Sequence, residues 1–531
     1  MRNRLWVWLL FLSVYLSGCA DNDFFQEDAL ATEAELQGRT PAGPDSAWVI
    51  AGRHYDRNGL HRFFWGDHNR SIWTTPVKLP VFDLHEVKGG LSVEDIGGGF
   101  QTTSFDLQDS TGRHYAFRSI DKNPVEVVSP FWQKTFVVNI LRDQTSAANP
   151  YAALVVPVLA EAVQVPHSTP TLYYVSKTDT TFGEYAPLVQ GRLFMLEEEY
   201  NGPTDLTPAF GDAVNFADSE DALKLRFNDN TYHFDQHAFA RARLLDLLIG
   251  DWDRHKGQWD WAVVRQGSDT YFRPVPKDRD QVFLQIQDGL IPSIATSKIL
   301  ARKLKSFDDD FKDVKAYMIN AEFVDNRLLH ELSLKEWQQI AQTMQAVLTD
   351  EVIQKAVRQL PPPVHAQIGP RIAHQLQRRR DLLPKAAAEM YEILAEKVTI
   401  PGTDQTEHFR VKRLDEGRTE VTVTRPAKGA VPAKQLYHRV FSKDETELIT
   451  LHGLAEDDVF EISGEVKDAI QLKVYGGLGE DDITDTSRVQ GWKKMTRIYD
   501  TDRGNDIVLG SEARDMTTDD VRVHAYDREG N

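Results

Sequence analysis

The stretch over residues 244–264 constrains the fold more than any other part of the chain. An apolar helical pattern runs to Ile249, and Gly250 then ends it. A polar loop over residues 251–258 follows, and an apolar, aromatic strand pattern begins at Trp259. This order places two carboxylates, an arginine and a histidine in a short loop between rigid elements, which is where chemical groups tend to lie in folded proteins.

A second acidic loop follows after a single strand. Residues 274–283 read Pro-Val-Pro-Lys-Asp-Arg-Asp-Gln-Val-Phe, with carboxylates at Asp278 and Asp280. Two loops joined by one strand can place their carboxylates around one site, and carboxylates of this kind hold Mg²⁺ beside phosphates. The sequence therefore predicts one metal–phosphate site that is built from both loops.

The N-terminus has the layout of an export signal. A positively charged start precedes an apolar run over residues 5–16, which is too short for a comfortable membrane span. The sequence Leu-Ser-Gly-Cys that ends at Cys19 resembles the lipobox of bacterial lipoproteins. The resemblance implies a signal peptide over residues 1–18 and a lipid on Cys19; the alternative is an ordinary secretory signal with a chance cysteine. Because Ala20 follows, and not aspartate, the resemblance favours an outer-membrane lipoprotein of the cell envelope.

Composition excludes some classes of function. The chain of 531 residues has room for about three domains at roughly 150 residues each. Its net charge of −19 argues against a general nucleic-acid binder, which needs a basic face. With Cys19 as the only cysteine, the mature chain has no disulfide and no thiol chemistry. Residues 19–48 are acidic, small and polar with two prolines, and we expect them to form a flexible tether to the first domain.

A glycine-rich turn and two basic residues mark the first half of the chain. Gly97, Gly98 and Gly99 precede a strand pattern, where glycines let backbone N–H groups approach phosphates, although three glycines can equally form a plain turn. A hairpin follows, and its second strand leads into Arg118 and Lys122. We expect these two side chains to neutralise phosphate charge.

The middle of the chain alternates strands and helices. Residues 152–163 have helical spacing, and strand patterns follow over residues 166–175 and 191–196. The acidic run over residues 197–203 is expected to be a solvated linker. A helix is then expected over residues 236–249, directly before the first acidic loop.

Helical spacing returns later and then ends. Residues 311–397 have a helical pattern that Pro361, Pro362 and Pro363 interrupt, and the pattern resumes over residues 372–394. After Pro401 strand patterns dominate.

Three acidic, glycine-containing segments echo each other in this last part, at a spacing of about 24 residues that favours stacked strands joined by turns. They cover residues 453–460, 476–483 and 502–508. The segments resemble the calcium-binding turns of RTX repeats, which implies Ca²⁺ here. True RTX repeats recur every nine residues, however, and the alternative is an ordinary β module that uses Gly and Asp in its turns.

The first 400 residues resemble the atypical kinases, among them HipA, the CotH spore-coat kinases, the secretory-pathway kinases and the type II phosphatidylinositol 4-kinases. Residues 253–258, Asp-Arg-His-Lys-Gly-Gln, have the layout of the catalytic loops D-x-H-x-x-N and D-R-H-x-x-E. Asp278 stands five residues before Phe283, as the metal-binding aspartate of these families does, and Asp278 with Asp280 forms a D-x-D pair.

This resemblance implies an α+β chain with a bilobal, atypical protein-kinase-like fold over residues 49–400, followed by a small all-β module over residues 401–531. The N-lobe would cover about residues 49–203 and the C-lobe about residues 204–400. Asp253 would be the catalytic residue. Asp278, Asp280 and Gln258 would hold Mg²⁺ or Mn²⁺ with a nucleotide, which Arg118, Lys122 and the glycine turn would bind.

The chain also resembles a family of large bacterial envelope proteins that carry the patterns DWDRH-x-x-QW and PxPxDRDQxF. Both patterns occur here, beginning at Asp251 and Pro274, and the resemblance covers about residues 50–520. In that family this region often precedes an outer-membrane β-barrel, sometimes with a metallophosphoesterase domain. The resemblance implies a partner in the envelope, either such a barrel or another envelope protein.

Two residues depart from the kinase pattern. Arg118 stands where the nucleotide-binding lysine is expected, and its guanidinium is larger and always charged; Lys122 lies four residues later and can substitute. Gln258 replaces asparagine or glutamate, and its longer side chain shifts the oxygen that would bind Mg²⁺. Three functions therefore stay open: a phosphotransferase, a catalytically inactive kinase-like binding or assembly module, and a metal-dependent phosphoesterase.

Overall fold

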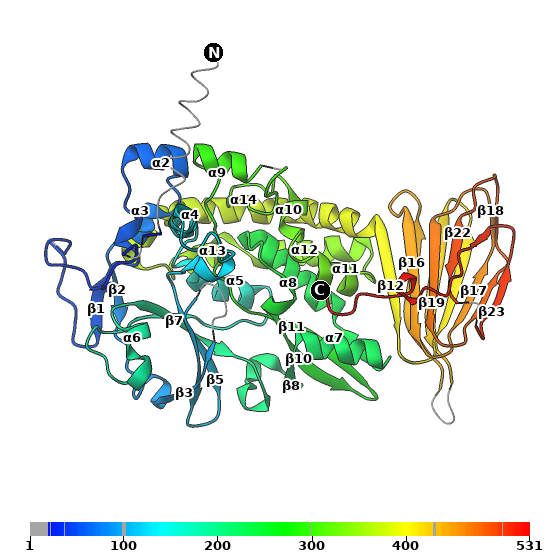
Figure 1. The fold of residues 1–531 in the computed structure, drawn as a ribbon, viewed down its shortest axis with the longest axis horizontal. Helices are drawn as coiled ribbons and strands as arrows, with labels where there is room; N and C mark the ends of the chain where they lie inside the picture. Colours follow the sequence, from blue (N-terminus) through cyan, green and yellow to red (C-terminus); the bar gives the residue numbers. More distant parts are fainter. Residues whose placement is uncertain are drawn as a thin grey trace, which may run out of the picture.

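A computed structural model describes residues 20–21, 23–36, 38–97, 102–297, 299–427, 432–501 and 503–530. Cys19, Gly98 and Gly99 lie outside these residues. The chain mixes helices and sheets. Figure 1 shows a larger body of helices and sheets on the left, and a body built of strands alone on the right. No helix in the described ranges is long and apolar enough to cross a membrane.

The first large sheet has five antiparallel strands in the order β3-β4-β5-β7-β6. These are β3 (Leu91–Gly97), β4 (Ser104–Asp109), β5 (His114–Ser119), β7 (Leu193–Glu199) and β6 (Thr171–Tyr174). The expected hairpin is present as β4 and β5, with Gly112 in its turn at φ 85°. One face of the sheet packs on a core of its own around Phe105, Phe117 and Phe194.

The charge pattern predicts that the acidic run over residues 197–203 is a solvated linker. This prediction is wrong for its first residues, which belong to strand β7 of this sheet. Glu197 and Glu199 belong to β7, where they pair with Ala116 and His114 of β5. Glu197 is only 5% exposed. Strand pairing with β5 overrides the preference of a charge run for solvent, because these residues continue the register that begins at Leu193.

Helices form the part of the chain that connects β5 to β6. They are α4 (Phe136–Gln144), the short 3-10 helix η5 (Ala152–Val155) and α5 (Val156–Ala162), so the expected helix over residues 152–163 is confirmed. The apolar side chains of η5 and α5 pack into the large helical core rather than against the five-stranded sheet. This part of the chain therefore joins the two cores.

The second sheet carries the two acidic loops. Its order is β8-β10-β11-β9, with β8 (Ala213–Asp218), β9 (Tyr232–Phe234), β10 (Trp259–Gln266) and β11 (Asp269–Pro276). Helix α7 (Ser219–Asn228) and helix α8 (Gln236–Ile249) pack on it. The expected helix over residues 236–249 is confirmed, with Asp235 as its N-cap and Gly250 as its left-handed C-cap.

Six further helices complete the larger body. They are α9 (Leu290–Ala295), α10 (Val314–Met318), α11 (Glu322–Leu328), α12 (Leu334–Val347), α13 (Asp350–Val357) and α14 (Pro362–Ala395). The sequence predicted that the three prolines at residues 361–363 interrupt the helix until residue 372, and this prediction is wrong. Pro362 is its first residue, a position where the missing N–H has no helical acceptor to lose and the fixed φ suits the helix.

The segment predicted as a flexible tether is packed instead. Phe24 and Ala29 are buried in the large core, and Arg53 donates to the carbonyl oxygen of Asp28 (2.7 Å) and to Glu35 (2.8 Å). Strand β1 (Ser46–Val49) pairs with β2 (Val77–Pro80). Composition missed this, since a few apolar side chains at irregular spacing suffice to dock an extended segment.

The body on the right of Figure 1 is a coil of stacked, mostly parallel strands. One wall contains β12 (Lys397–Thr403), β16 (Leu448–Ala455), β19 (Gln471–Leu478), β22 (Thr496–Tyr499) and β24 (Ala513–Asp515), all parallel. Leu448 pairs with Gln471 and Leu472 with Thr496, so these two coils take 23 and 24 residues. The expected stacking of strands at this spacing is confirmed.

The opposite wall continues the coil and is closed at one end by a meander. Its strands are β13 (His408–Leu414), β17 (Val459–Ser463), β20 (Asp482–Asp485) and β23 (Asp506–Leu509) in parallel, with β14 (Arg418–Arg425) and β15 (Lys434–Ser442) antiparallel beside β13. Apolar side chains from both walls form a separate core.

No flexible linker separates this coil from the helices. Helix α14 ends at Ala395 and β12 begins at Lys397, while Pro401 and Gly402 are buried within β12. The last residues return to the larger body, where the ring of Tyr526 packs against Phe227. The coil therefore follows the larger body directly and is held to it by the last residues of the chain.

The recurring Gly/Asp segments have a structural cause inside the coil. Asp458 accepts a hydrogen bond from the N–H of Glu407 (2.7 Å), and Asp481 accepts one from the N–H of Asp458 (2.8 Å), so each carboxylate ties its coil to the one before. A Cβ at Gly453 would clash with Asp458, and one at Gly476 would clash with Asp481. Glycine is required where the carboxylate of the same turn packs on the backbone.

These interior carboxylates are not grouped as calcium ligands. Among the described residues no group of three or more His, Cys, Asp or Glu side chains is arranged to hold a metal ion. Burial raises the pKa of Asp458 to about 10 and, with the negative charge of Asp500, that of Asp481 to about 7. These shifts favour the protonated form of both carboxyl groups.

We expect the free energy of unfolding of the coil to fall as the pH rises from about 4 to about 7. Within this window the unfolded chain releases the proton of Asp481 while the folded chain retains it, which costs about 1.4 kcal/mol per pH unit for one group. Asp481→Asn should reduce this slope by about 1.4 kcal/mol per pH unit, the share of one carboxyl group, while Asp458, whose pKa is raised to about 10, keeps its own share. Urea denaturation of the full chain at several pH values measures it. The exposed neighbour substitution Asp482→Asn is the control and should leave the profile as it is; an unchanged profile in Asp481→Asn would contradict the assignment.

Candidate functional site

The first acidic loop starts where α8 ends. Gly250 has φ 75°, and a Cβ there would clash with the ring of Phe307. This left-handed residue turns the chain from α8 into the loop over residues 251–258. Asp251 and Arg254 of the loop are fully buried, while Asp253 is only partly buried. The charged side chains of Asp251 and Arg254 are thus enclosed in the body, while the carboxylate of Asp253 stays partly exposed.

A buried network of charges holds this loop to its surroundings. It contains three arginines and three aspartates, namely Arg243, Arg254, Arg279, Asp246, Asp251 and Asp325. Arg243 donates to Asp325 (2.7 Å) and Asp246 (2.8 Å), and Arg279 donates to Asp251 (2.8 Å). Its formal charges cancel, as buried ions require.

The two acidic loops meet through backbone and side-chain contacts. Arg254 donates to the carbonyl oxygen of Lys277 (2.8 Å) and to that of Gln258 (2.7 Å), one from each loop. The side-chain amide of Gln258 donates to Asp278 (3.3 Å). The predicted convergence of the loops is confirmed by these contacts, and the distance between them is that of a hydrogen bond.

Asp278 and Asp280 point to the same side of their loop, and Arg279 points away from it into the buried network. Asp278 has φ 57°, which is uncommon for a residue with a side chain and marks a sharply bent backbone. Asp280 pairs with Lys122 and accepts from Gln281 (2.9 Å). Asp278 lies beside Gln258 instead, so the two aspartates have different partners.

The basic side chains approach from the five-stranded sheet. Arg118 on β5 lies 3.9 Å from Glu197 and 3.7 Å from Glu199 of the neighbouring β7. A cavity borders both basic residues; its lining includes Arg118, Lys122, Asp278 and Asp280 together with Trp73, Thr102, Ala148, Asn149, Pro150 and Met195. The structure therefore brings five of the predicted residues, Arg118, Lys122, Gln258, Asp278 and Asp280, to one place.

Electrostatics connect Asp253 with this group. Burial raises the pKa of Asp278, but the charges of Lys122 and Arg118 outweigh it and lower that pKa below its usual value. Burial lowers the pKa of Lys122, although the charges of Asp278 and Asp253 oppose the shift. Asp253 is thus near enough to Lys122 for its charge to act on the lysine. Asn320 donates a hydrogen bond of 2.6 Å to Asp253 and fixes the direction of its carboxylate.

The acidic strand β7 contributes a second unusual carboxyl. Burial raises the pKa of Glu197 to about 7, with Arg118 opposing the shift. One carboxylate oxygen of Glu199 is buried without a hydrogen-bond partner, as is one of Asp260. Both residues line a small hollow behind Arg118 with Ala116, Tyr200 and Asp278. The space beside Arg118 is thus polar and negatively charged.

Gly97, the one described residue of the glycine turn, does not line the cavity. Gly97 ends β3, where a Cβ would make ordinary contacts with Asp106, while Gly98 and Gly99 lie outside the described residues. Thr102 lines the cavity a few residues later. The turn therefore remains a prediction from the sequence.

The residues present fit a divalent cation only in part. Gln258 and Asp278 offer two oxygens, and the amide oxygen of Gln258 is buried without a hydrogen-bond partner. The amide nitrogen of Gln258 faces Asp278, so the amide group must turn over before both oxygens can bind one Mg²⁺ or Mn²⁺, which take oxygen ligands and usually keep several waters. Among the described residues no group of three or more His, Cys, Asp or Glu side chains completes a metal site here.

Two contributors to the site escaped the sequence. Asn320 reaches Asp253 from 67 positions later, two residues after the end of α10, and no local motif marks it. Glu197 was hidden in a run that charge alone assigned to solvent. The strand pattern that precedes Glu197 is the one signal that points to burial.

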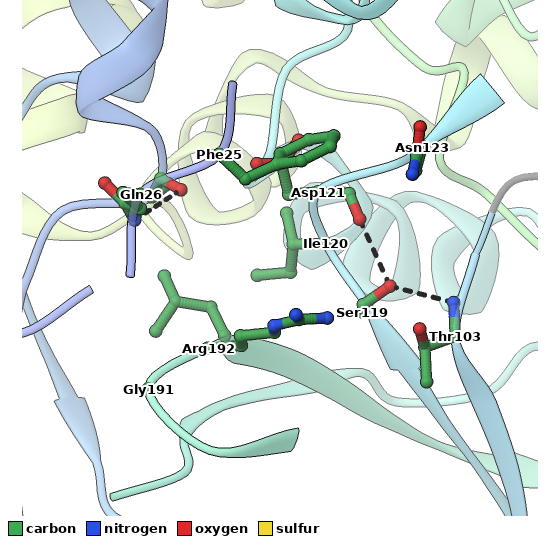
Figure 2. Close-up of a pocket in the computed structure, with 11 residues that line it drawn as sticks. Phe25, Gln26, Thr103, Ser119, Ile120, Asp121, Asn123, Gly191 and Arg192 are labelled. Carbon is green, nitrogen blue, oxygen red and sulfur yellow. Dashed lines mark hydrogen bonds between the residues drawn. The ribbon is translucent and has the colours of Figure 1, made fainter. Parts of the chain in front are cut away.

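A second cavity lies beside the first, across the end of β5. Figure 2 shows Phe25 and Arg192 on opposite sides of it, with Ser119, Ile120 and Asp121 between them. Thr103 donates its backbone N–H to the hydroxyl of Ser119 (3.1 Å), which donates in turn to the carbonyl oxygen of Asp121 (3.1 Å). None of the predicted site residues lines this cavity.

No protein-family model and no curated protein matches the chain. Among solved structures, the proinflammatory kinase CtkA of Helicobacter pylori is 12% identical, covers 59% of this chain and 98% of that chain, and gives a TM-score of 0.30. HipA in the HipA–HipB–operator DNA complex of the toxin–antitoxin system of Shewanella oneidensis MR-1 is 13% identical, covers 57% and 67%, and gives 0.25. Both likenesses are weak, and the function proposed below rests on the geometry of the site.

We expect Asp251→Ala to lower the free energy of unfolding by about 3–5 kcal/mol, because it leaves buried arginine charge without compensation. Asp468→Ala is the matched control. It removes an aspartate from an exposed pair with Lys443, which should cost at most about 1 kcal/mol. Urea denaturation of both variants measures the difference, and similar losses in the two would contradict a structural role of the network.

Proposed function

We propose that residues 49–400 form a bilobal, atypical kinase-like domain that transfers a phosphoryl group from a nucleotide with the help of Mg²⁺ or Mn²⁺. One observation carries the proposal: Gln258 and Asp278 from two loops converge at a cavity that Arg118 and Lys122 line from the other sheet. Phosphoryl transfer requires this combination of metal-binding oxygens, phosphate-neutralising cations and a carboxylate for the acceptor.

Each side chain has a defined task in this proposal. Asp253, held by Asn320, accepts the proton of an acceptor hydroxyl as its oxygen bonds to the phosphorus and the bond to the leaving oxygen breaks. Lys122 and Arg118 neutralise charge on the phosphates. Gln258 and Asp278 would hold the metal ion, which neutralises phosphate charge when it is bound.

Asp280 has a different role from Asp278 in this arrangement. It forms an ion pair with Lys122, whereas Asp278 accepts a hydrogen bond from the amide nitrogen of Gln258, whose oxygen has no partner. We assign the metal to Asp278 and Gln258, and assign Asp280 the task of holding Lys122 in place. A nucleotide phosphate would take the place of the Asp280 carboxylate on Lys122.

The second candidate is a catalytically inactive kinase-like module that binds or assembles with another envelope component. The state of the basic residues favours it, since Arg118 lies between two glutamates and Lys122 is paired with Asp280. Both cations are already neutralised, and a nucleotide must compete for them.

We also propose that Cys19 carries a lipid and anchors the chain to the outer membrane, where an outer-membrane barrel or another envelope protein is its partner. The lipobox-like sequence at residues 16–19 supports the lipid. The resemblance to envelope proteins supports the partner, and the net charge of −19 disfavours nucleic acid.

Metal and nucleotide together should raise the melting temperature of the chain more than either does alone, because the cation offsets the negative charge that the nucleotide adds to the carboxylates. Asp278→Asn should remove most of this shift. Asp280→Asn should keep it or increase it, because the substitution frees Lys122 for phosphate. Thermal denaturation with Mg²⁺ or Mn²⁺ and with ATP, GTP or neither measures these effects. Equal losses in both variants would refute the division of labour between the aspartates.

Replacing Asp253 separates catalysis from binding. Asp253→Asn should reduce transfer of a labelled γ-phosphoryl group to the chain or to an envelope extract by about 100-fold or more, while the thermal shift with metal and nucleotide persists. Asp309→Asn, at an exposed position, is the control and should retain activity. Nucleotide binding without transfer in the unaltered chain, or no nucleotide binding at all, would overturn the phosphotransferase and favour the inactive module.

A further inference from the structure

The body begins directly at the proposed lipid attachment point. The N–H of Ala20 donates to the carbonyl oxygen of Lys134 (3.1 Å), and the N–H of Asp21 donates to the side chain of Asn139 (2.8 Å). Arg142 donates to the carbonyl oxygen of Asp21 (2.6 Å). Consecutive Cα atoms lie about 3.8 Å apart, so a lipid on Cys19 would hold the surface around α4 against the membrane.

Many of the exposed large apolar side chains of the molecule lie on the surface around α4. Of the 23 exposed large hydrophobic residues in the described ranges, eleven fall within three short segments, residues 59–65, 131–141 and 290–300. We call them the apolar face: Leu60, Phe63, Phe64, Phe131, Trp132, Leu141, Leu290, Ile291, Ile294, Ile299 and Leu300. Soluble surfaces rarely concentrate such residues unless something covers them.

The three segments are neighbours in space. His61 of α2 (Gly59–Trp65) lies 3.0 Å from Asp143 of α4, and Gln144 of α4 donates to the carbonyl oxygen of Trp65 (3.4 Å). A Cβ at Gly289, just before α9, would clash with the backbone of Gly66, just after α2. Figure 1 shows α2, α4 and α9 on the same side of the larger body. The apolar face is therefore continuous with the point where the chain enters.

The chemistry of the face suits the interface of a bilayer. Leu60, Phe63 and Phe64 share one side of α2, and the rings of Phe131 and Trp132 contact each other at 4.8 Å. Aromatic side chains beside basic ones are typical of membrane interfaces, and the exposed Lys134 lies next to this pair. Within residues 290–300 only Lys298 carries a charge.

We propose that the apolar face lies on the phospholipid surface into which the lipid on Cys19 inserts. The inference rests on the lipid attachment proposed above, and it adds a second contact to it. A lipid fixes one point and leaves the orientation of the body free, whereas short helices with apolar, aromatic sides bind in the plane of the interface and fix the orientation as well.

A fluorescent probe on the face tests the inference in the full, lipid-modified chain. Phe63→Cys and, separately, Ile294→Cys are labelled with an NBD fluorophore, since a lipid-bearing Cys19 leaves no other thiol to label. In vesicles of phosphatidylethanolamine and phosphatidylglycerol, we expect both probes to shift to the blue and to be quenched by spin-labelled phospholipid. Trp492→Cys, at a 96% exposed position of the coil, is the control and should show neither effect.

Three outcomes would overturn the inference. Mass spectrometry of Cys19 shows whether the lipid proposal fails with it. Probes at positions 63 and 294 that stay in water while Cys19 carries lipid would overturn the inference alone. A blue shift without quenching by the phospholipid would assign the face to a second copy of the chain or another protein. An unmodified Cys19 in a chain that does not bind vesicles would overturn both proposals.

Discussion

The buried network of three arginines and three aspartates is the interaction on which the site depends. Arg279 stands between Asp278 and Asp280, and its charge is held inside by Asp246 and Asp251. Once Arg279 is held inward, the two flanking aspartates point outward to the cavity. The positive φ of Asp278 belongs to the same arrangement, because the chain must bend sharply to alternate its side chains in this way. Buried ion pairs seldom add net stability, so orientation of the loop explains this network better.

Arg254 gives the network its second function. Its side chain binds the carbonyl oxygens of Gln258 and Lys277, one residue from each acidic loop, while its charge interacts with Asp246 and Asp251. The distance between the two loops is therefore fixed from inside the body rather than by a metal ion. A site that is organised in this way exists before any ligand binds, which reduces the cost of binding.

The sequence indicated the elements whose signals are local. The bounds of the helix at residues 236–249 followed from apolar spacing and a terminal glycine, and the coils followed from a repeat of about 24 residues that parallel strand stacking requires. Convergence of the two loops was predicted from a single connecting strand, whereas the antiparallel hairpin of β10 and β11 joins them and returns the chain beside its start. The docking of residues 20–48, the burial of Glu197 and the contact of Asn320 with Asp253 depend on partners far away in the chain. A pattern within a short window carries no information about such partners.

The electrostatics of the cavity couple its ligands. Around it, Asp278, Asp280, Glu197 and Glu199 face two cations, Arg118 and Lys122, each of which is already within ion-pair distance of a carboxylate. A nucleotide alone adds negative charge to this group, and a divalent cation alone reduces it. Each ligand therefore favours the other, and the coupling must be reciprocal. The carboxylates around the cavity repel a phosphate on its own, so phosphate binding at this site depends on the metal ion.

The continuity of the chain extends these constraints to the whole molecule. Helix α14 runs into β12 without a linker, and the final residues bind back across the junction, with Arg528 paired to Asp404 (2.6 Å) and Arg327 bonded to the carbonyl oxygen of Asp527 (3.0 Å). The coil is thus fixed to the larger body. If the apolar face lies on a bilayer, the long axis in Figure 1 runs along the membrane, because α2 and α9 lie on a long side of the molecule. The coil would then extend beside the membrane at a set height, where a rigid, laterally directed arm can reach a neighbouring envelope protein.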